Sequence, residues 1–420
     1  MNKIFINIPA YRDPELVLTI KDCLAQAKYP ERITMGICRQ YHPDDTFDNV
    51  DEYRSNKQFK IIDRLYTTAN GLPAIRKLVN ELITDEDFIL QLDAHHRFTK
   101  NWDTTLEEMH SVLEKKGYRP ILTGYQPCYD PKTDPVGRAQ EPWLQQYDVF
   151  HEGGTIHMRP GLIPDWENKT EPVRARFISG HFIFARTKWT RDVPHDPNIY
   201  FSGEELNLTI RSFTHGYDLF HPHRVVLWHS PGRTERAGIM AWDDQTKRGI
   251  DINKLQEESR RRVRTLIRSE DNPDIDLTGY ELGTERTLRD YEKYSGIHYK
   301  KRSVQRYTKD HKLPPNPYIA SDEDWEASFL YQFEYNISFN SSCFSYNDYS
   351  FWAVIFEDVN GISLHREDLN KEQVISIYNH LTPKMINIPA KFLTDKDPSK
   401  WIVWGYRENI GWAEKIEGKI

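Results

Sequence analysis

FILQLDAHHRF, residues 88–98, places a strand-like apolar run directly before Asp93 and His95. A run of this kind predicts a buried β-strand, and in open α/β sheets ligands bind where such strands end. Because one residue separates Asp93 from His95, an extended chain directs both side chains to the same side, where they can share one divalent cation. Taken alone, the pair is more typical of a turn capped by Asp93, so its meaning depends on the rest of the chain.

A third protein ligand is expected, because two side chains leave the coordination shell of a catalytic metal incomplete. His229 is the best candidate, since the apolar residues 225–228 predict a strand that presents it at a sheet edge much as residues 90–92 present Asp93. The chain offers further histidines for this place, namely His96, His181, His221 and His223.

Residues 1–125 alternate short β-rich runs with amphipathic helical stretches, which is the pattern of a parallel sheet covered by helices. Asp13-Pro14 predicts the start of the first helix, and apolar residues at helical spacing predict two more at 71–83 and 102–113. The expected strands are 3–8, 33–38, 60–66 and 88–92. The sequence therefore predicts a doubly wound α/β fold.

Residues 126–175 lose this periodicity and interleave Pro, Gly, Trp, His and charged residues. A loop of this length inside a compact domain is usually either disordered or functional, and its aromatic content favours an ordered, functional loop. Strand character returns at 176–186, and residues 206–213 look helical.

The last quarter of the chain has a different pattern. LPPNP, residues 313–317, is the clearest linker. Beyond it, apolar and polar residues alternate over 331–339, which predicts a half-buried strand. A strand at 351–356, a turn at Asn360-Gly361 and one helix near 369–380 are also expected. We therefore expect a main domain of residues 1–312 and a small β-rich domain of residues 318–420.

The composition narrows the possible partners and location. The chain has 420 residues and a formal net charge of −7, so it has no general attraction to nucleic acid. No window approaches twenty apolar residues and no signal-peptide pattern opens the chain, so we expect neither a transmembrane segment nor secretion. The four cysteines lack CxxC spacing, which argues against a disulfide framework or a zinc site and favours the cytoplasm.

An Asp/His metal set in such a protein favours phosphate oxygens as the remaining ligands, because a hard cation stabilises the charge on a departing nucleoside diphosphate. Neither GxxxxGK[ST] nor GxGxxG occurs in the sequence, so P-loop and classical dinucleotide sites lack their motifs. A nucleotide-sugar site fits these residues better.

Seven segments carry a resemblance to a known family. In order they are IPAYRDPEL (8–16), ANGLPAIRKLVNEL (69–82), LQLDAHHRF (90–98), FISGHFIFA (177–185), YFSGEELNLTIRSFTHGYDLFHP (200–222), VVLWHSPGR (225–233) and LGTERTLRDYEKYSG (282–296). Their order and spacing resemble the metal-dependent polypeptide and hydroxyproline α-N-acetylglucosaminyltransferases of the GT-A fold, glycosyltransferase family 60. The resemblance covers about residues 1–300 and implies a mostly parallel, Rossmann-like sheet.

The resemblance assigns the donor site residue by residue. The segment at 8–16 would border the uridine with Pro9, Ala10, Tyr11 and Arg12. Asp13 would either pair with the base or ribose or simply cap the following helix. Gly71 and Arg76 match a segment whose arginine approaches the diphosphate or the metal carboxylate, a task suited to its bidentate fork. A surface arginine on an amphipathic helix is the alternative.

The same resemblance implies a DxH metal motif at Asp93 and His95, with Ala94 where a small hydroxyl residue often stands. Gly180 would lie under the donor sugar, where a glycine lets the backbone approach the ligand. His181 would contact the sugar or be an ordinary buried histidine. Two acidic residues, Glu204 and Glu205, would face the sugar and the acceptor, the alternative being stabilisation of a helix N-terminus.

The implied function is a retaining glycosyltransferase that uses Mn²⁺ or Mg²⁺ and moves GlcNAc from UDP-GlcNAc to a hydroxyl acceptor of the Ser, Thr or hydroxyproline type. The alternatives are a transferase acting on a polysaccharide or glycolipid, and a non-catalytic carbohydrate- or protein-binding module. Either a protein or a glycan acceptor is compatible with the sequence. The candidate acceptor wall within the 126–175 loop is Trp143, Tyr147, His157, Arg159 and Trp166.

Overall fold

The structure is a computed structural model that describes residues 2–151, 153–232, 236–343, 349–379 and 384–420. Its contacts divide the chain into two compact units. The first comprises Met1–Lys300 and Tyr307–Tyr318, and the second comprises Lys301–Arg306 and Ile319–Ile420. The short helix α9 (Arg306–Lys309) spans the boundary between these ranges.

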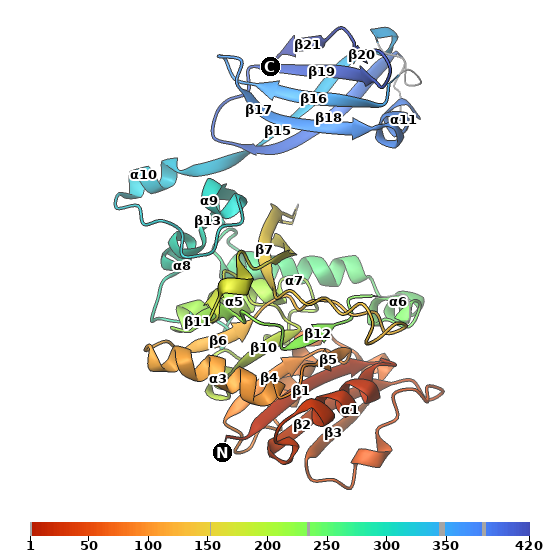
Figure 1. Ribbon diagram of the computed structural model, residues 1–420, viewed down its shortest axis with the longest axis vertical. Coiled ribbons are helices and arrows are strands. Elements are labelled where there is room, and N and C mark those ends of the chain that lie inside the picture. The colour runs from red at the N-terminus through yellow and green to blue at the C-terminus, as the bar shows by residue number, and fades with distance from the viewer. Residues whose placement is uncertain (1, 152, 233–235, 344–348, 380–383) are drawn as a thin grey trace. The chain divides into compact units, whose positions relative to one another are not determined.

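The first unit is built on an eight-stranded sheet (Figure 1). In spatial order its strands are β3 (Phe59–Leu65), β2 (Ile33–Tyr41), β1 (Ile4–Tyr11), β4 (Phe88–Leu92), β10 (Phe182–Arg186), β6 (Pro120–Thr123), β11 (Asp218–His221) and β9 (Val173–Arg174). Strands β1 to β4 run parallel, as do β6 and β11, whereas β10 is antiparallel to both β4 and β6. This confirms the expected α/β fold with a mostly parallel sheet.

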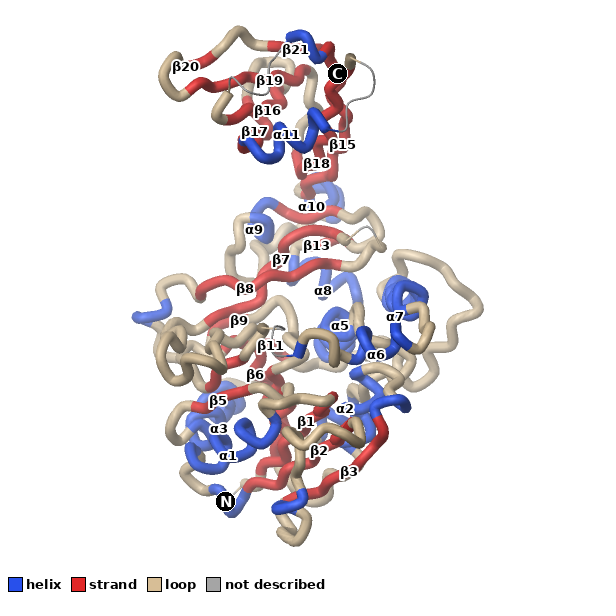
Figure 2. Tube along the Cα trace, turned by 90° about the vertical axis from the view of Figure 1, so that its right-hand side faces the viewer, coloured by secondary structure: helices blue, strands red, loops and turns tan. Residues whose placement is uncertain are grey.

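Helices cover both faces of this sheet because its strands alternate apolar side chains between the faces. Ile4, Ile6 and Ile8 of β1 pack with α1 (Leu16–Gln26) and α3 (Trp102–Lys115). Phe5 faces the other way, into a cluster with α2 (Leu72–Asn80), α4 (Lys188–Asp192) and α5 (Glu204–Thr214). Figure 2 shows α1 and α3 on one side of the strands and α2 on the other. The carboxyl ends of β1 and β4 stay uncovered by these helices and carry the site described below.

The first unit contains further helices and strands. They are β5 (His96–Phe98), β7 (Trp143–Phe150), β8 (Ile156–Leu162), β12 (Leu227–His229), α6 (Ala241–Lys247), α7 (Ile252–Leu266), α8 (Leu288–Ser295) and β13 (Ile297–His298). The loop predicted over 126–175 is therefore partly wrong, because β7 and β8 form an antiparallel hairpin there. A bulge between Tyr147 and Val149 interrupts the period-two pattern by which a strand is recognised in sequence.

The second unit is β-rich, as expected. It contains β14 (Ser303–Gln305), α10 (Asp322–Ala327), β15 (Phe329–Asn340), β16 (Phe351–Glu357), β17 (Ser363–Asn370), α11 (Lys371–Asn379), β18 (Met385–Thr394), β19 (Lys400–Arg407), β20 (Gly411–Trp412) and β21 (Ile416–Lys419). Strands β14, β15 and β18 form one sheet, and β16, β17 and β19 to β21 form another. One core lies between them, including Ile337, Trp352 and Ile388. The predicted helix end at residue 380 lies outside the described residues.

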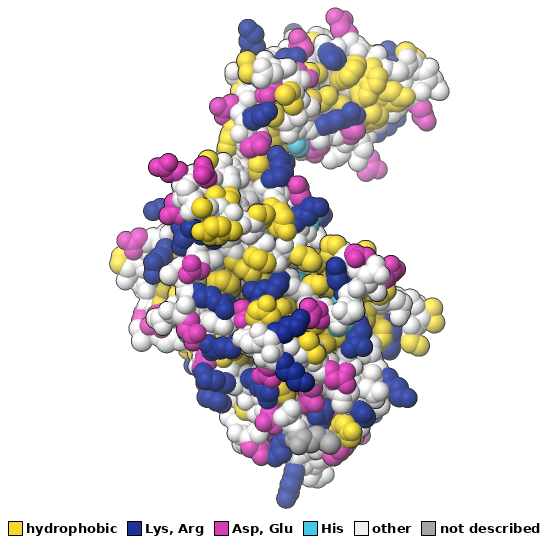
Figure 3. All heavy atoms as spheres, turned by 60° about the vertical axis from the view of Figure 1, so that its left-hand side comes forward, with side chains coloured by type: hydrophobic (Ala, Val, Ile, Leu, Met, Phe, Trp, Pro, Cys, Tyr) yellow, Lys and Arg dark blue, Asp and Glu magenta, His cyan; other side chains and the backbone are white. Residues whose placement is uncertain are grey.

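The surface shows no large region of one charge on the face drawn in Figure 3, where basic and acidic side chains are interspersed. This agrees with the modest net charge of the chain. Among the helices that the structure describes, none has the length and hydropathy needed to cross a bilayer.

Candidate active site

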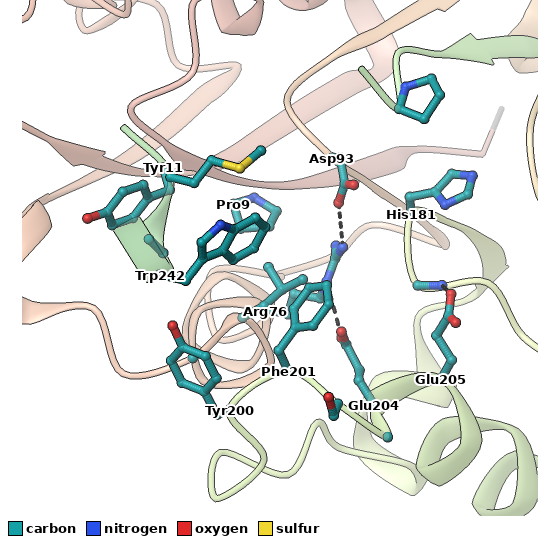
Figure 4. A pocket seen from close by; sticks show the side chains of 18 of the residues that line it. Pro9, Tyr11, Arg76, Asp93, His181, Tyr200, Phe201, Glu204, Glu205 and Trp242 are labelled. Atoms are coloured by element: carbon teal, nitrogen blue, oxygen red, sulfur yellow. Dashed lines mark hydrogen bonds and ion pairs between the residues drawn. The ribbon is translucent and has the colours of Figure 1, made fainter. Parts of the chain in front are cut away.

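A cavity of about 690 Å³ opens at the carboxyl ends of β1 and β4. The sequence-predicted residues that line it are Pro9, Tyr11, Gly71, Arg76, Asp93, His95, Gly180, His181, Glu204, Glu205 and His229. Two predicted residues are not part of this lining. Ala10 is fully buried, and the Arg12 guanidinium turns to Asp45 at 2.7 Å and Asp244 at 2.8 Å. The fold thus gathers side chains from across the first 230 residues into one pocket (Figure 4).

Asp93, His95 and His229 form the one cluster of potential metal ligands found among the described residues, with ligand atoms within 4.8 Å of one another. Asp93 Oδ2 lies 3.5 Å from His229 Nε2 and 3.7 Å from His95 Nε2. Strand β12 delivers His229 because it pairs antiparallel with β5, directly after the Asp93 segment. His229 is the last residue of β12, so a separate two-stranded sheet presents it beside the main sheet's Asp93.

The environment of these side chains suits a divalent cation. Both ring nitrogens of His229 are buried without a hydrogen-bond partner, and burial lowers its pKa to about 4, so the ring is neutral as a metal ligand must be. His95 Nδ1 lies 2.8 Å from Asp13 Oδ2, which leaves Nε2 facing Asp93. Burial opposes the charge of Asp13, but His95 and Arg236 outweigh it and lower the pKa of this carboxyl. The residues present thus fit a metal centre.

Arg76 connects this cluster to Glu204. Its side chain is fully buried; one guanidinium nitrogen donates to Asp93 Oδ1 at 2.8 Å, and Nε lies 3.3 Å from Glu204 Oε1 (Figure 4). Burial opposes ionisation of Asp93, yet His229 and Arg76 hold the pKa of the carboxyl well below its usual value. Gly71, directly before α2, lets the chain pass close to Tyr200, because at its φ of 113° a Cβ would lie 2.7 Å from the Tyr200 carbonyl oxygen.

Gly180 and Glu205 form the floor of the pocket. Residues 176–181 were predicted to extend the strand, but β10 begins only at Phe182, and Gly180 lies in the turn before it. The Gly180 N–H donates to Glu205 Oε1 at 2.8 Å, and Gln145 Nε2 donates to Oε2 at 3.0 Å. Burial raises the pKa of Glu205 to about 7.

The other histidines considered as ligands do not belong to this cluster. His181 Nε2 accepts from the Gln126 N–H at 3.1 Å, its Nδ1 lies 3.0 Å from Ser179 Oγ, and its ring stacks on His229 at 4.1 Å. His96 donates to the Trp228 carbonyl and His221 to that of Thr123, at 3.0 and 2.7 Å. His223 does not line the cavity. His229 is the histidine that the fold brings to Asp93 and His95.

The side of the pocket near Pro9 and Tyr11 is aromatic. Trp242 of α6 lies beside these two residues, and Tyr200 and Phe201 complete the wall (Figure 4). Helix α6 is tied to β1 because Asp244 accepts hydrogen bonds from the Tyr11 hydroxyl at 3.0 Å and from Arg12. Sequence reasoning missed Trp242, which lies outside every recognised segment.

The opposite side of the pocket is formed by β8. Of the five residues predicted as an acceptor wall, His157 and Arg159 line the cavity, while Trp143, Tyr147 and Trp166 do not. Tyr147 points into the core, with 1% of its surface exposed. Among the described residues β8 pairs only with β7, so its other edge is unpaired.

Comparison with known families identifies the chain. The sequence model of the family described as Glycosyltransferase (GlcNAc) matches residues 3–62 and 47–301, well over half of the chain. The chain belongs to this GlcNAc glycosyltransferase family. The matched range agrees with the extent of the resemblance found in the sequence. Together with the mostly parallel sheet, it confirms the expected GT-A class of fold.

Solved structures with related folds include GalNAc-T7 with UDP, GalNAc and Mn²⁺, at 13% identity and a TM-score of 0.48, covering 69% of this chain and 56% of that one. Another is S. aureus TarS 1–349 in complex with UDP-GlcNAc, at 14% identity and a TM-score of 0.35, covering 55% and 59%. The chain therefore spans less than two thirds of the length of either. No curated protein sequence matches it.

Proposed function

We propose that this member of the GlcNAc glycosyltransferase family transfers GlcNAc from UDP-GlcNAc to a hydroxyl acceptor, with a divalent cation and with retention at the anomeric carbon. The observation that carries the proposal is the Asp93, His95 and His229 cluster at the end of β4, within a pocket large enough for a nucleotide sugar. The four unpaired cysteines support the cytoplasm as its location.

The donor would lie across the pocket. Its base would stack in the aromatic wall of Tyr11 and Trp242, and its diphosphate would reach Asp93 and its neighbours. A Mn²⁺ or Mg²⁺ ion on Asp93, His95 and His229 would offset the negative charge of the leaving diphosphate. Arg76 holds Asp93 in place through its guanidinium.

Retention would follow from attack on the face that UDP leaves. The acceptor oxygen bonds to the anomeric carbon, the bond from that carbon to the phosphate oxygen breaks, and the departing oxygen takes the acceptor proton. Both pocket glutamates are engaged, because Glu204 faces Arg76 and Glu205 accepts from Gly180 and Gln145. They are thus suited to orienting the sugar and acceptor rather than to acting as a covalent nucleophile.

The acceptor we propose is a polypeptide bearing a Ser, Thr or hydroxyproline hydroxyl. The unpaired edge of β8 beside the pocket supports this choice, because an extended peptide can hydrogen-bond to a free strand edge. His157 and Arg159 would contact it there.

The deciding experiment is calorimetric titration of UDP into the full chain with and without Mn²⁺. We expect binding to need the cation, and to be lost in Asp93→Asn and His229→Ala while the metal-free variants keep their melting temperature. Transfer from UDP-GlcNAc should fall more than about tenfold in both. Cation-independent UDP binding, or a variant that keeps more activity than this, would refute the metal assignment.

Transfer assays then test the acceptor, with Ser-, Thr- and hydroxyproline-containing peptides compared against oligosaccharides. Modification of the peptides is the expected result. Transfer to sugars alone would replace the polypeptide by a glycan acceptor.

A further inference from the structure

Two buried polar side chains lie directly beneath the pocket and have no place in the site described so far. Gln91 is the next-to-last residue of β4 and is fully buried, and His195 follows α4 with 1% of its surface exposed. Gln91 is two residues before Asp93 and so leaves the strand on the same side. Burying such polar groups costs free energy unless they are hydrogen-bonded, so the positions of their partners are informative.

One end of this pair is hydrogen-bonded to Gly180. His195 Nε2 lies 2.7 Å from Gln91 Oε1, and Gln91 Nε2 donates to the Gly180 carbonyl at 2.8 Å. The Gly180 N–H is held by Glu205. The polar groups of Gly180 are therefore fixed on both sides, its carbonyl from below by Gln91 and its N–H by the helix α5.

The other end of the pair lies next to Glu204. His195 Nδ1 lies 3.4 Å from Glu204 Oε1, the same oxygen that faces Arg76 Nε at 3.3 Å. The His195 ring is itself held edge-on to Trp189, 6.1 Å away, in the apolar cluster beneath the sheet. Neither His195 Nδ1 nor Glu204 Oε1 has a hydrogen-bond partner among the described residues, so the pair packs against Glu204 but is hydrogen-bonded to Gly180.

We propose that Gln91 and His195 are positioning residues that set the sugar-binding end of the donor site. Gln91 fixes the Gly180 carbonyl and His195 holds Gln91 in place, while the groups around Pro9 and Tyr11, where the base would bind, do not contact them. This inference rests on the proposed function. It adds that selectivity for the sugar, as distinct from affinity for UDP, depends on a buried pair that does not line the pocket.

The test compares dissociation constants of the full chain for UDP-GlcNAc and for UDP, in the presence of Mn²⁺. Gln91→Met keeps the size of the side chain but removes both hydrogen bonds. We expect it to weaken UDP-GlcNAc binding about tenfold, as for the loss of a buried hydrogen bond, and to change UDP binding less than about twofold. His195→Phe keeps a ring against Trp189 and should show the same selective loss.

Gln58→Met is the matched control, because the Gln58 amide likewise donates to the backbone, to the Pro30 and Ile33 carbonyls, but lies away from the pocket lining. It should change neither constant. Equal binding by wild type and Gln91→Met, a parallel loss of both ligands, or failure of both site variants to fold would overturn the proposal. Wild-type protein that binds neither UDP nor UDP-GlcNAc would instead refute the proposed function itself.

Discussion

Asp13 lines the pocket and lies directly behind His95 of the proposed metal centre. Its carboxylate faces His95 Nδ1, and its other oxygen accepts from the Glu15 N–H at the start of α1. The two roles considered from the sequence, a contact with the donor and a helix cap, do not include this contact with His95. His95 lies 82 positions further along the chain, so no local pattern in the sequence indicates it. A carboxylate on a ligating histidine fixes the ring and makes it a better ligand.

Asp13→Asn should therefore weaken Mn²⁺ binding about 10- to 100-fold, because the amide does not bring the negative charge that supports His95. Calorimetric titration with Mn²⁺ measures this directly. Asp45→Asn is a suitable control, since Asp45 pairs with Arg12 and does not line the pocket. Unchanged Mn²⁺ affinity in Asp13→Asn would exclude a role for Asp13 in supporting the ligand.

Glu205 predicts a pH dependence of stability. Its pKa is raised by burial to about 7, so the folded protein binds a proton that the unfolded chain releases near pH 4.3. Stability should therefore fall as pH rises from about 4.3 to 7, by up to about 4 kcal/mol at pH 8. The Glu205→Gln variant should not show this loss of folding stability at high pH. Its amide can still accept from Gly180, and Gln145 Oε1, which has no partner, can accept its N–H after an amide flip.

Thermal unfolding without metal at pH 5 and pH 8 checks this expectation. Glu205→Gln should melt higher than wild type at pH 8, and the difference should shrink at pH 5. A variant that is less stable than wild type at pH 8 would show that the carboxylate charge is favourable in the fold.

At the scale of elements, helix α6 supplies a wall of the pocket through Trp242. Trp242→Ala should raise the dissociation constant for UDP about tenfold, because stacking of a base on an aromatic ring contributes about 1–3 kcal/mol. Trp166→Ala is the control, since Trp166 lies in a short helical turn outside the pocket. Calorimetric titration of UDP into each variant, in the presence of Mn²⁺, measures both dissociation constants. Equal affinities would place the base elsewhere.

The whole molecule allows the role of the second unit to be tested. We predict that it recruits the acceptor or a partner, because every side chain of the proposed metal centre and pocket belongs to the first unit and the second has a core of its own. Truncation should follow Tyr318 and not Pro315, because Asn316 is buried and accepts from Arg176 at 2.8 Å.

The truncated chain should bind UDP and slowly hydrolyse UDP-GlcNAc like the full chain, but transfer poorly to a large acceptor. Undiminished transfer to every acceptor would exclude recruitment. A fragment that is insoluble, or that melts well below the full chain, would show that the two units share a core.

The sequence alone predicted the α/β core and the Asp93 and His95 pair, because both depend on local patterns, whereas most of the other predicted pocket residues came from the family resemblance. Apolar periodicity is visible along the chain, so the strands around Ile6 and Leu90 and the helices behind them were predicted correctly. Asp93 and His95 could be paired because one residue separates them in an extended segment. Glu204 and Glu205 stood out as an acidic pair opening a helix.

The tertiary structure decided which distant side chains meet. His229 reaches Asp93 through the pairing of β12 with β5. Trp242 lies beside Tyr11 because a hydrogen bond from Tyr11 holds α6 against β1. Neither contact produces a periodic pattern in the sequence. No sequence motif singled out Gln91 or His195, yet hydrogen bonds join them beneath Gly180. Local propensity fixes an element, but the contacts between elements depend on packing and hydrogen bonding across the whole sheet, and these exist only once the chain has folded.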